Sequence, residues 1–224
     1  MATRPHFSVA GIPVRVEPVF FVVSALFGLR YAEESVSLVF VWIGVTFVSI
    51  LVHELGHGLS LKAFGTPSAI VLHGFGGVTL SRRSLDRTRS VVVSMAGSIV
   101  ALAVLWLPAR HLEASDWYLQ QDLWLRGVVT FTAFANLWWS VANLLPIRPL
   151  DGGNVVSELF GTPVGRRASV VVATAGGIWA VRNDQVYAGL FAFFLAWTNF
   201  QEIQTERTGG RPTTFDVDGP NPPP

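Results

Sequence analysis

The stretch Val36–Leu61, VSLVFVWIGVTFVSILVHELGHGLSL, determines the fold that this sequence predicts. Residues 36–52 contain no charged side chain, and the apolar run continues without a break into the sequence HELGH. At about 1.5 Å per residue, a helix of this length covers about 39 Å, whereas the hydrocarbon core of a bilayer is about 30 Å thick. We therefore expect a membrane-spanning helix that carries two histidines and a glutamate.

The sequence HELGH places His53 and His57 four positions apart. Because residues four apart share one face of a helix, both imidazoles can reach one metal ion. Glu54 follows His53 directly, where its carboxylate reaches an attacking water rather than the ion. Ionisable groups in a membrane cost about 2.5 to 3.5 kcal/mol each on insertion scales and usually mark a functional site. This context favours a zinc site over a pair of core histidines.

A third protein ligand is expected, because a catalytic zinc site uses three protein ligands and keeps one position open. The strongest candidate is Asp151 in the segment Asn143–Gly153, NLLPIRPLDGG. Pro146 and Pro149 interrupt the helix there, and irregular backbone at membrane depth survives only where protein or water satisfies its polar groups. An aqueous site would provide such water. The alternative is that Asp151 caps a helix starting at Gly152, and the two roles can coexist.

The composition supports a membrane protein and limits the ligand chemistry. Half of the 224 residues are hydrophobic, 14% are charged and the mean hydropathy is +0.46, whereas soluble domains carry about 25% charge. The 8 Trp and 16 Phe residues suit membrane interfaces. A net charge of +1 gives no indication of a nucleic-acid surface. Because cysteine is absent, any metal site must use His, Asp and Glu.

Further apolar segments complete a predicted helical bundle. Val19–Leu29 is short for a span, so a re-entrant or interfacial segment is its alternative. Pro67–Ser81 has β-branched residues around a glycine cluster and predicts a hairpin or re-entrant loop, and Phe7–Val16 is strand-like. The predicted fold class is an all-α membrane protein, a polytopic bundle of about six transmembrane helices with a short membrane-associated β-hairpin. The expected spans are Val19–Leu29, Val36–Leu61, Ser90–Ala109, Leu125–Leu145, Ala168–Val181 and Val186–Phe200.

The charges of the loops predict an orientation. Basic residues gather between the second and third spans and after the fourth, whereas acidic residues dominate the loop before the second span and the loop 110–122. By the positive-inside rule, the chain is a multi-pass protein of the cell membrane with both termini cytoplasmic. Met1–Glu17 lacks the layout of a cleavable signal peptide, so the spans themselves would direct insertion. The basic residues are Lys62, Arg82, Arg83, Arg87, Arg89, Arg148, Arg166 and Arg167.

HELGH together with NLLPIRPLDGG resembles the site-2 protease family of intramembrane metalloproteases, whose signatures are HExxH and N-x-x-P-x-x-P-x-D-G. Every fixed position of both signatures is present, and the resemblance covers roughly Phe7–Phe200. It implies a zinc-dependent intramembrane endopeptidase that cleaves transmembrane segments of membrane proteins, in regulated intramembrane proteolysis. It also implies one Zn²⁺ per chain as cofactor, with the lipid bilayer and a transmembrane protein substrate as partners. The oligomeric state is left open.

The resemblance further implies roles for individual residues. The glycine-bearing stretch His73–Gly77 resembles the membrane-dipping hairpin of the family, and Asn143 is implied to hold the substrate backbone or to steady the oxyanion. Gly97-Ser98 resembles a Gly-Pro pair in the third helix of the family but departs from it at the second position. The implied set is the metal ligands His53, His57 and Asp151, the catalytic residues Glu54 and Asn143, and the substrate-binding residues Asn143, Gly76 and Gly77.

A minimal member of that family is expected. The sequence leaves no room for a PDZ domain between the third and fourth spans or for a nucleotide-binding CBS domain after Phe200. We expect an intramembrane protease domain over residues 1–203 and a disordered tail over residues 204–224, which end in GPNPPP. One rival function is a proteolytically inactive relative that binds membrane partners, and the intact Glu54 counts against it. A metal transporter is the other, and it would need ionisable residues along a route through the membrane, whereas the candidates here cluster near one depth.

Overall fold

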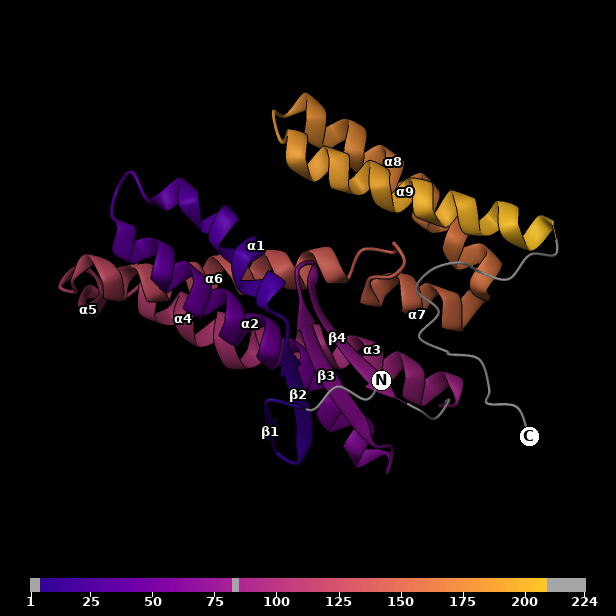
Figure 1. Ribbon diagram of the computed structural model, residues 1–224, viewed down its shortest axis with the longest axis horizontal. Coiled ribbons are helices and arrows are strands. Elements are labelled where there is room, and N and C mark those ends of the chain that lie inside the picture. The colour runs from indigo at the N-terminus through magenta and orange to yellow at the C-terminus, as the bar shows by residue number, and fades with distance from the viewer. Residues whose placement is uncertain (1–4, 82–84, 209–224) are drawn as a thin grey trace. The chain divides into compact units, whose positions relative to one another are not determined.

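The chain is mostly helical and contains one small sheet (Figure 1). The computed structural model describes residues 5–81 and 85–208. Two compact units are present. The N-terminal unit comprises residues 1–83 and 96–141, and the C-terminal unit comprises residues 84–95 and 142–224.

The elements follow one another in this order along the chain. The first group is β1 (Phe7–Val9), β2 (Ile12–Val16), α1 (Pro18–Gly28), the 3-10 turn η1 (Leu29–Tyr31), α2 (Val36–Ala63), β3 (Ser68–His73) and β4 (Gly76–Ser81). The second is α3 (Arg87–Ala101), the π-helical turn η2 (Leu102–Trp106), α4 (Leu107–Glu113), α5 (Asp116–Leu119) and α6 (Leu123–Asn143). The last is α7 (Asp151–Phe160), α8 (Thr162–Arg182) and α9 (Val186–Arg207).

The sheet joins two parts of the chain that are far apart in the sequence. Its order is β1-β2-β3-β4, with antiparallel pairs at both ends and a parallel pair, β2 with β3, in the middle. Val14 lies opposite Ile70 in that parallel pair. The hairpin predicted within Pro67–Ser81 is confirmed as β3 and β4. The sheet is nevertheless larger than an all-α protein with one short hairpin would have, because the strand-like stretch Phe7–Val16 adds two strands to it.

One face of the sheet packs on the second half of α2. Val14, Ile70 and Leu72 are fully buried in one cluster with Phe20 of α1 and Ile50 of α2. Successive residues of a strand point to opposite faces, so alternate residues of β2 and β3 supply this core. Burying one such side chain is worth about 1.5 to 3 kcal/mol. The cluster therefore fixes the sheet beside the turn of α2 that carries HELGH.

Helix α1 lies along the first half of α2. The rings of Phe20 and Phe21 lie 6.2 and 6.0 Å from the ring of Phe47 between centroids. At the other end of α1, a Cβ on Gly28 would lie 2.9 Å from the side chain of Trp42, so the glycine lets the two helices approach closely. The two helices thus run antiparallel, and α2 continues beyond α1 to the level of the sheet.

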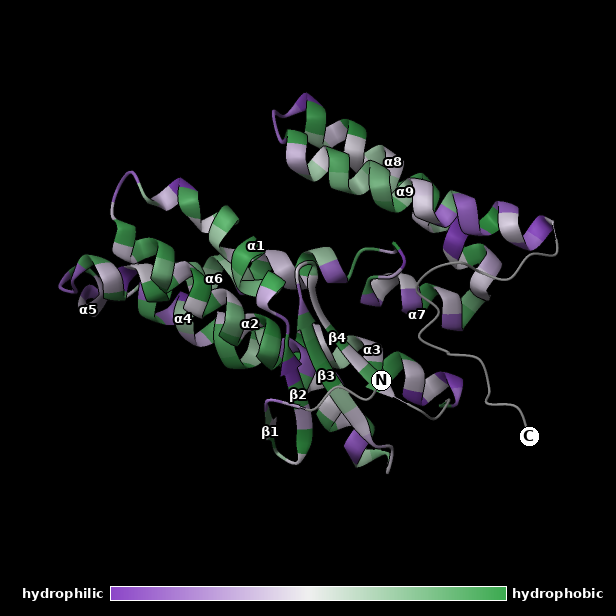
Figure 2. Cartoon of the chain, viewed as in Figure 1, coloured by the Kyte–Doolittle hydropathy of each residue, from purple (hydrophilic) through white to green (hydrophobic). Residues whose placement is uncertain are grey.

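Two of the described helices are long and apolar enough to cross a membrane, namely Val36–Ala63 and the continuous helix Arg87–Glu113. Pro18–Tyr31 is apolar but shorter. Val22 and Phe27 on α1 are 58% and 62% exposed, as expected of side chains that face lipid. Figure 2 shows hydrophobic residues over most of α1 and α2. Helices occupy all six predicted spans, but the length and composition of the other four do not by themselves make them spans.

In the C-terminal unit, α8 and α9 form an antiparallel pair (Figure 1). Ala173 and Leu195 are buried in the core of this unit. At the start of α8, Arg166 is 2% exposed and donates to Glu202, at 2.7 Å, and to Glu206. These two glutamates lie near the end of α9, so ion pairs of the buried Arg166 join the start of one helix to the end of the other.

Two predictions fall partly outside the residues that the structure describes. The tail expected over residues 204–224 is described only to residue 208, and α9 continues to Arg207. Residues 209–224 lie outside the described ranges. Arg82 and Arg83, two of the basic residues between the second and third expected spans, also lie outside them.

Candidate metal centre

The HELGH turn is regular α-helix within α2 and holds its three ionisable side chains away from solvent. His53, Glu54 and His57 are 2%, 4% and 7% exposed. The Nε2 atoms of the two histidines lie 3.2 Å apart. The prediction that the spacing of four residues brings both imidazoles to one side of the helix is confirmed.

Asp151 opens helix α7. Leu150 is the N-cap residue, with φ −63° and ψ 158°, and Asp151 is the first helical residue. The structure therefore differs from the alternative in which Asp151 caps a helix starting at Gly152. A carboxylate in the first turn of a helix is stabilised by the helix dipole, typically by about 0.3 to 1 kcal/mol. That position leaves its side chain available as a ligand.

Two glycines allow the loop before α7 to fold back on the start of the helix. A Cβ on Gly152 would lie 2.2 Å from the backbone oxygen of Leu144, and a Cβ on Gly153 would lie 2.4 Å from the backbone nitrogen of Arg148. Real Cβ atoms do not approach backbone so closely. The Gly152-Gly153 pair after Asp151 is thus explained by the close approach of backbone to backbone.

The irregular loop finds partners for its backbone within the C-terminal unit. The backbone N–H of Arg148 donates to Oγ of Ser169 on α8 at 2.8 Å. The carbonyl oxygen of Arg148 accepts a hydrogen bond from Nδ2 of Asn199 on α9 at 2.8 Å. Non-helical backbone at membrane depth requires such partners. The sequence analysis expected the water of an aqueous site to satisfy this backbone, whereas at Arg148 two protein side chains, Ser169 and Asn199, do so.

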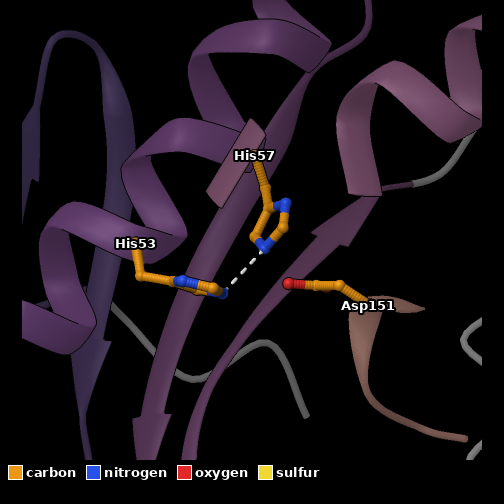
Figure 3. Close-up of side chains that lie close together, drawn as sticks. All are labelled: His53, His57 and Asp151. Carbon is orange, nitrogen blue, oxygen red and sulfur yellow. Dashed lines mark hydrogen bonds between the residues drawn. The ribbon is translucent and has the colours of Figure 1, made fainter. Parts of the chain in front are cut away.

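The predicted ligands form one group. One ring nitrogen from each of His53 and His57 and one carboxylate oxygen of Asp151 all lie within 4.8 Å of one another. Figure 3 shows the three side chains pointing toward one another. Two imidazoles and a carboxylate are ligands that zinc accepts, and three protein ligands leave a fourth position open, as in catalytic zinc sites.

The geometry around the two histidines fits a zinc ion. With Zn–N bonds of about 2.0 to 2.1 Å, two tetrahedral ligands lie about 3.3 Å apart, close to the observed 3.2 Å between the Nε2 atoms. Gly97 of α3 keeps the space beside them open. A Cβ on Gly97 would lie 2.4 Å from Nε2 of His57 and 2.8 Å from Nε2 of His53, where it would compete with an ion. The sequence analysis noted Gly97 but did not predict this role.

Strand β4 contacts Glu54 directly. Oγ1 of Thr79 donates to Oε2 of Glu54 at 2.7 Å and lies 3.1 Å from the backbone oxygen of the same residue. A Cβ on Gly77 would lie 2.4 Å from Cγ of Glu54, so this glycine makes room for the glutamate side chain. Sequence reasoning missed Thr79. The available signal was its position two residues after Gly77, on the same face of the strand.

The remaining candidates lie at the ends of elements. Gly76 begins β4 with φ +126°, and a Cβ there would lie 2.7 Å from the indole ring of Trp139 on α6. The ring of Trp139 also lies 6.4 Å from that of His53, edge to face. Asn143 is the last residue of α6 and is 8% exposed. These placements give Gly76 and Gly77 packing roles, and they leave the predicted substrate contacts of Gly76, Gly77 and Asn143 as predictions.

Comparisons with known proteins agree with the two motifs. The family model of peptidase family M50 matches residues 118–181. A zinc metalloprotease of Methanocaldococcus jannaschii is 23% identical over 96% of this chain and 66% of its own length. A Synechocystis protein, named as a candidate zinc metalloprotease, is 29% identical over 76% of this chain and 48% of its own length. The chain thus spans about half to two thirds of the length of these curated relatives.

The fold is also shared with a solved structure. The site-2 protease from Methanocaldococcus jannaschii superposes with a TM-score of 0.61 and 21% sequence identity, over 88% of this chain and 93% of that one. The family match includes the Asp151 loop, and the relative and the solved structure from Methanocaldococcus jannaschii extend the similarity over most of the chain. The chain is therefore similar to peptidase family M50 over residues 118–181 and to zinc metalloproteases over most of its length, and it shares the fold of a site-2 protease.

Proposed function

We propose that the chain is a zinc-dependent endopeptidase that cleaves transmembrane segments of membrane proteins. The observation that carries the proposal is the ligand group of His53, His57 and Asp151 beside a buried Glu54 on a helix apolar enough to span the bilayer. Members of this family are integral membrane proteins, and the long apolar helices agree with that environment.

The ligand set and Glu54 divide the chemistry between them. His53, His57 and Asp151 would hold one zinc ion, which supplies Lewis-acid chemistry by acidifying water and polarising a peptide carbonyl. Glu54 would take the proton from the attacking water and return it to the leaving nitrogen. The side-chain amide of Asn143 would donate to the oxygen of the carbonyl as negative charge develops there.

An inactive membrane-binding relative is the second candidate function, and the site argues against it. Such a relative needs no general base, yet Glu54 is present, buried and held by a hydrogen bond from Thr79. A buried carboxylate is costly to maintain in a membrane protein. A metal transporter is less well supported still, because the metal-binding side chains found among the described residues lie close together in space rather than along a route through the membrane.

The activity is tested by comparing the membrane proteins of cells that carry the parent chain with those of cells that carry Glu54→Ala. We expect one or more intact membrane proteins to accumulate in the variant, with loss of a fragment that ends inside a transmembrane segment. Quantitative proteomics of the membrane fraction measures both. Identical membrane proteomes under conditions where the parent is expressed would contradict the proposal.

For the topology, we propose six spans with both termini in the cytoplasm, and residues 1–203 as the protease domain. The loop charges support this orientation, and helices are present at all six positions. A reporter fused after Arg87 or after Gln204 should score as cytoplasmic, and one at Ser115 as external. An external signal from the Arg87 fusion would reverse the orientation.

The substrate is proposed to unwind before cleavage. In a helix, side chains surround each peptide bond, and its carbonyl oxygen accepts a hydrogen bond from the backbone N–H four residues further on. Strand β4 lies at the edge of the sheet, so its outer side offers a place for strand addition, with Gly76, Gly77 and Asn143 as contacts. Substrate helices with Gly or Pro near the scissile bond should then be cut faster than those with Leu or Ala. Equal rates for Gly-Pro and poly-Leu versions would exclude unwinding.

A further inference from the structure

The hairpin and the proposed general base are joined by one hydrogen bond. Thr79 of β4 places its hydroxyl 2.7 Å from Oε2 of Glu54. A hydroxyl has one hydrogen, and an ionised carboxylate is a stronger acceptor than the backbone oxygen of Glu54 at 3.1 Å. The shorter contact therefore takes the hydrogen. Both partners lie within the N-terminal unit.

The pairing of the strands explains why a small polar residue occupies this position. Thr79 lies opposite Ile70, and Gly77 lies opposite Leu72. Residues directly opposite in a sheet share a face. Ile70 and Leu72 belong to the core against α2, so Thr79 and Gly77 also face α2. On the face of the sheet that packs on α2, β3 carries apolar side chains, whereas β4 carries the small residue Gly77 and the polar residue Thr79. The side chain of Glu54 lies against these two residues.

Gly77 and Thr79 fix Glu54 in complementary ways. The missing side chain of Gly77 leaves room for Cγ and Cδ of Glu54, which would lie 2.4 and 2.7 Å from a Cβ there. Thr79 then holds one carboxylate oxygen, Oε2. The rotation of the carboxylate about its last bond is broad when nothing restrains it. One hydrogen bond from a strand removes that freedom and decides where Oε1 points.

We propose that Thr79 is a positioning residue for Glu54: it binds Oε2 so that Oε1 is aimed at the attacking water. The proposal rests on the proposed protease function and deepens it. Because the donor lies on the strand proposed to accept substrate, the aim of the general base depends on the placement of β4. Thr79 itself touches neither substrate nor metal in this role.

The experiment uses the zinc-loaded full chain in detergent micelles and a single-span substrate. Thr79→Val keeps the shape and the strand preference of the residue and removes the hydroxyl, whereas Thr79→Ser keeps the hydroxyl. We expect Thr79→Val to lower kcat by about tenfold to a hundredfold, which is part of the roughly 10²–10⁴-fold that general acid–base catalysis contributes, with KM and zinc content unchanged. Thr79→Ser should return kcat to within about threefold of the parent.

Two further variants separate positioning from damage to the fold. Thr198→Val removes a threonine hydroxyl that bonds within its own helix, to the oxygen of Leu195, and it should leave kcat unchanged. Glu54→Gln should abolish cleavage and keep zinc. A Thr79→Val protein with the kcat of the parent would overturn the proposal. So would a rise in KM at constant kcat, since that pattern indicates a substrate contact.

Failure of the proposed function would look different. Parent and Glu54→Gln would then be equally inactive, and no variant would differ from them. The contact itself can still be tested by unfolding midpoints in micelles of Thr79→Val, Glu54→Ala and the double variant. Midpoint losses that add fully would show that the two side chains do not interact and would overturn the positioning role on its own.

Discussion

The HELGH turn of α2 and the loop that leads to Asp151 both present metal-binding side chains, but they do so by different means. In the turn, the spacing of four residues along one helix brings the two histidine Nε2 atoms within 3.2 Å of each other. The loop relies on Gly152 and Gly153 and on two hydrogen bonds of the Arg148 backbone, whose N–H donates to Ser169 and whose oxygen accepts from Asn199, 21 and 51 residues away in the sequence. The half of the site on α2 is thus positioned by contacts local in the sequence, and the half that contains Asp151 is positioned by tertiary contacts.

The largest effect should come from removing a ligand from either half. We expect His53→Ala, His57→Ala and Asp151→Ala each to lower zinc from about one per chain to below about a tenth, because each removes one of three protein ligands. Elemental analysis of purified protein measures this, and Glu54→Gln is the control that should keep its zinc. Full zinc in Asp151→Ala would restrict the metal site to the HELGH half.

Gly97→Ala should have the second largest effect on zinc binding. It changes the space beside the two histidines without removing a ligand. The added methyl would lie 2.4 and 2.8 Å from the two histidine nitrogens, so we expect most of the zinc to be lost. Gly44→Ala on α2 is a matched control, since nothing lies within 4 Å of a Cβ there. If Gly97→Ala binds as much zinc as Gly44→Ala, the space beside the histidines is not where the ion lies.

Gly152→Ala should perturb the tertiary half to a smaller extent. The new Cβ would lie 2.2 Å from the oxygen of Leu144, and backbone must move to accommodate it. Overpacking of this kind costs about 1 to 3 kcal/mol, so we expect a lower unfolding midpoint together with a partial loss of zinc affinity. Gly176→Ala, where nothing lies within 4 Å, is the control in the same unit. Unchanged stability and affinity would show that the loop adapts freely.

The smallest predicted effect is that of Ser169→Ala. This change removes the acceptor of the Arg148 N–H, at a cost of about 1 kcal/mol. For a chain of this size, we expect the unfolding midpoint to fall by roughly 2 to 4 °C and zinc to bind slightly more weakly. Calorimetry and zinc titration in micelles measure the two. Thr198→Val, which removes a hydroxyl bonded within α9, should weaken zinc binding less.

The same contrast explains how much could be predicted from the sequence. The pairing of His53 with His57 followed from helix geometry, and the hairpin followed from β-branched residues around glycines. Asp151 followed from the proline and glycine pattern. The hydrogen bond from Thr79 to Glu54 did not, since it depends on how a strand and a helix pack. Ser169 and Asn199 carry no local signal either, because a polar residue on a helix gives no indication of a distant loop.

The parallel pairing of β2 with β3 was also beyond local patterns. Phe7–Val16 could be recognised as strand-like, but its partner Ile70 lies beyond two helices in the sequence. Nothing in either strand specifies the other. The number of membrane spans was difficult to predict for a different reason. Helices α8 and α9 contain enough polar and small residues that their composition does not distinguish a membrane span from a buried helix.

That parallel pair has a consequence for how the chain is inserted during synthesis. The end of β3 also meets the start of α1, through the bond from the Glu17 N–H to the Leu72 oxygen at 2.8 Å. The polypeptide between β2 and β3 must therefore leave one level of the bilayer and return to it. If α2 crosses, α1 must make the opposite passage, even though it is short. The two helices would then insert together as a helical hairpin. Strand β2 would stay on the side of the membrane where the ribosome lies, unpaired until β3 has been synthesised.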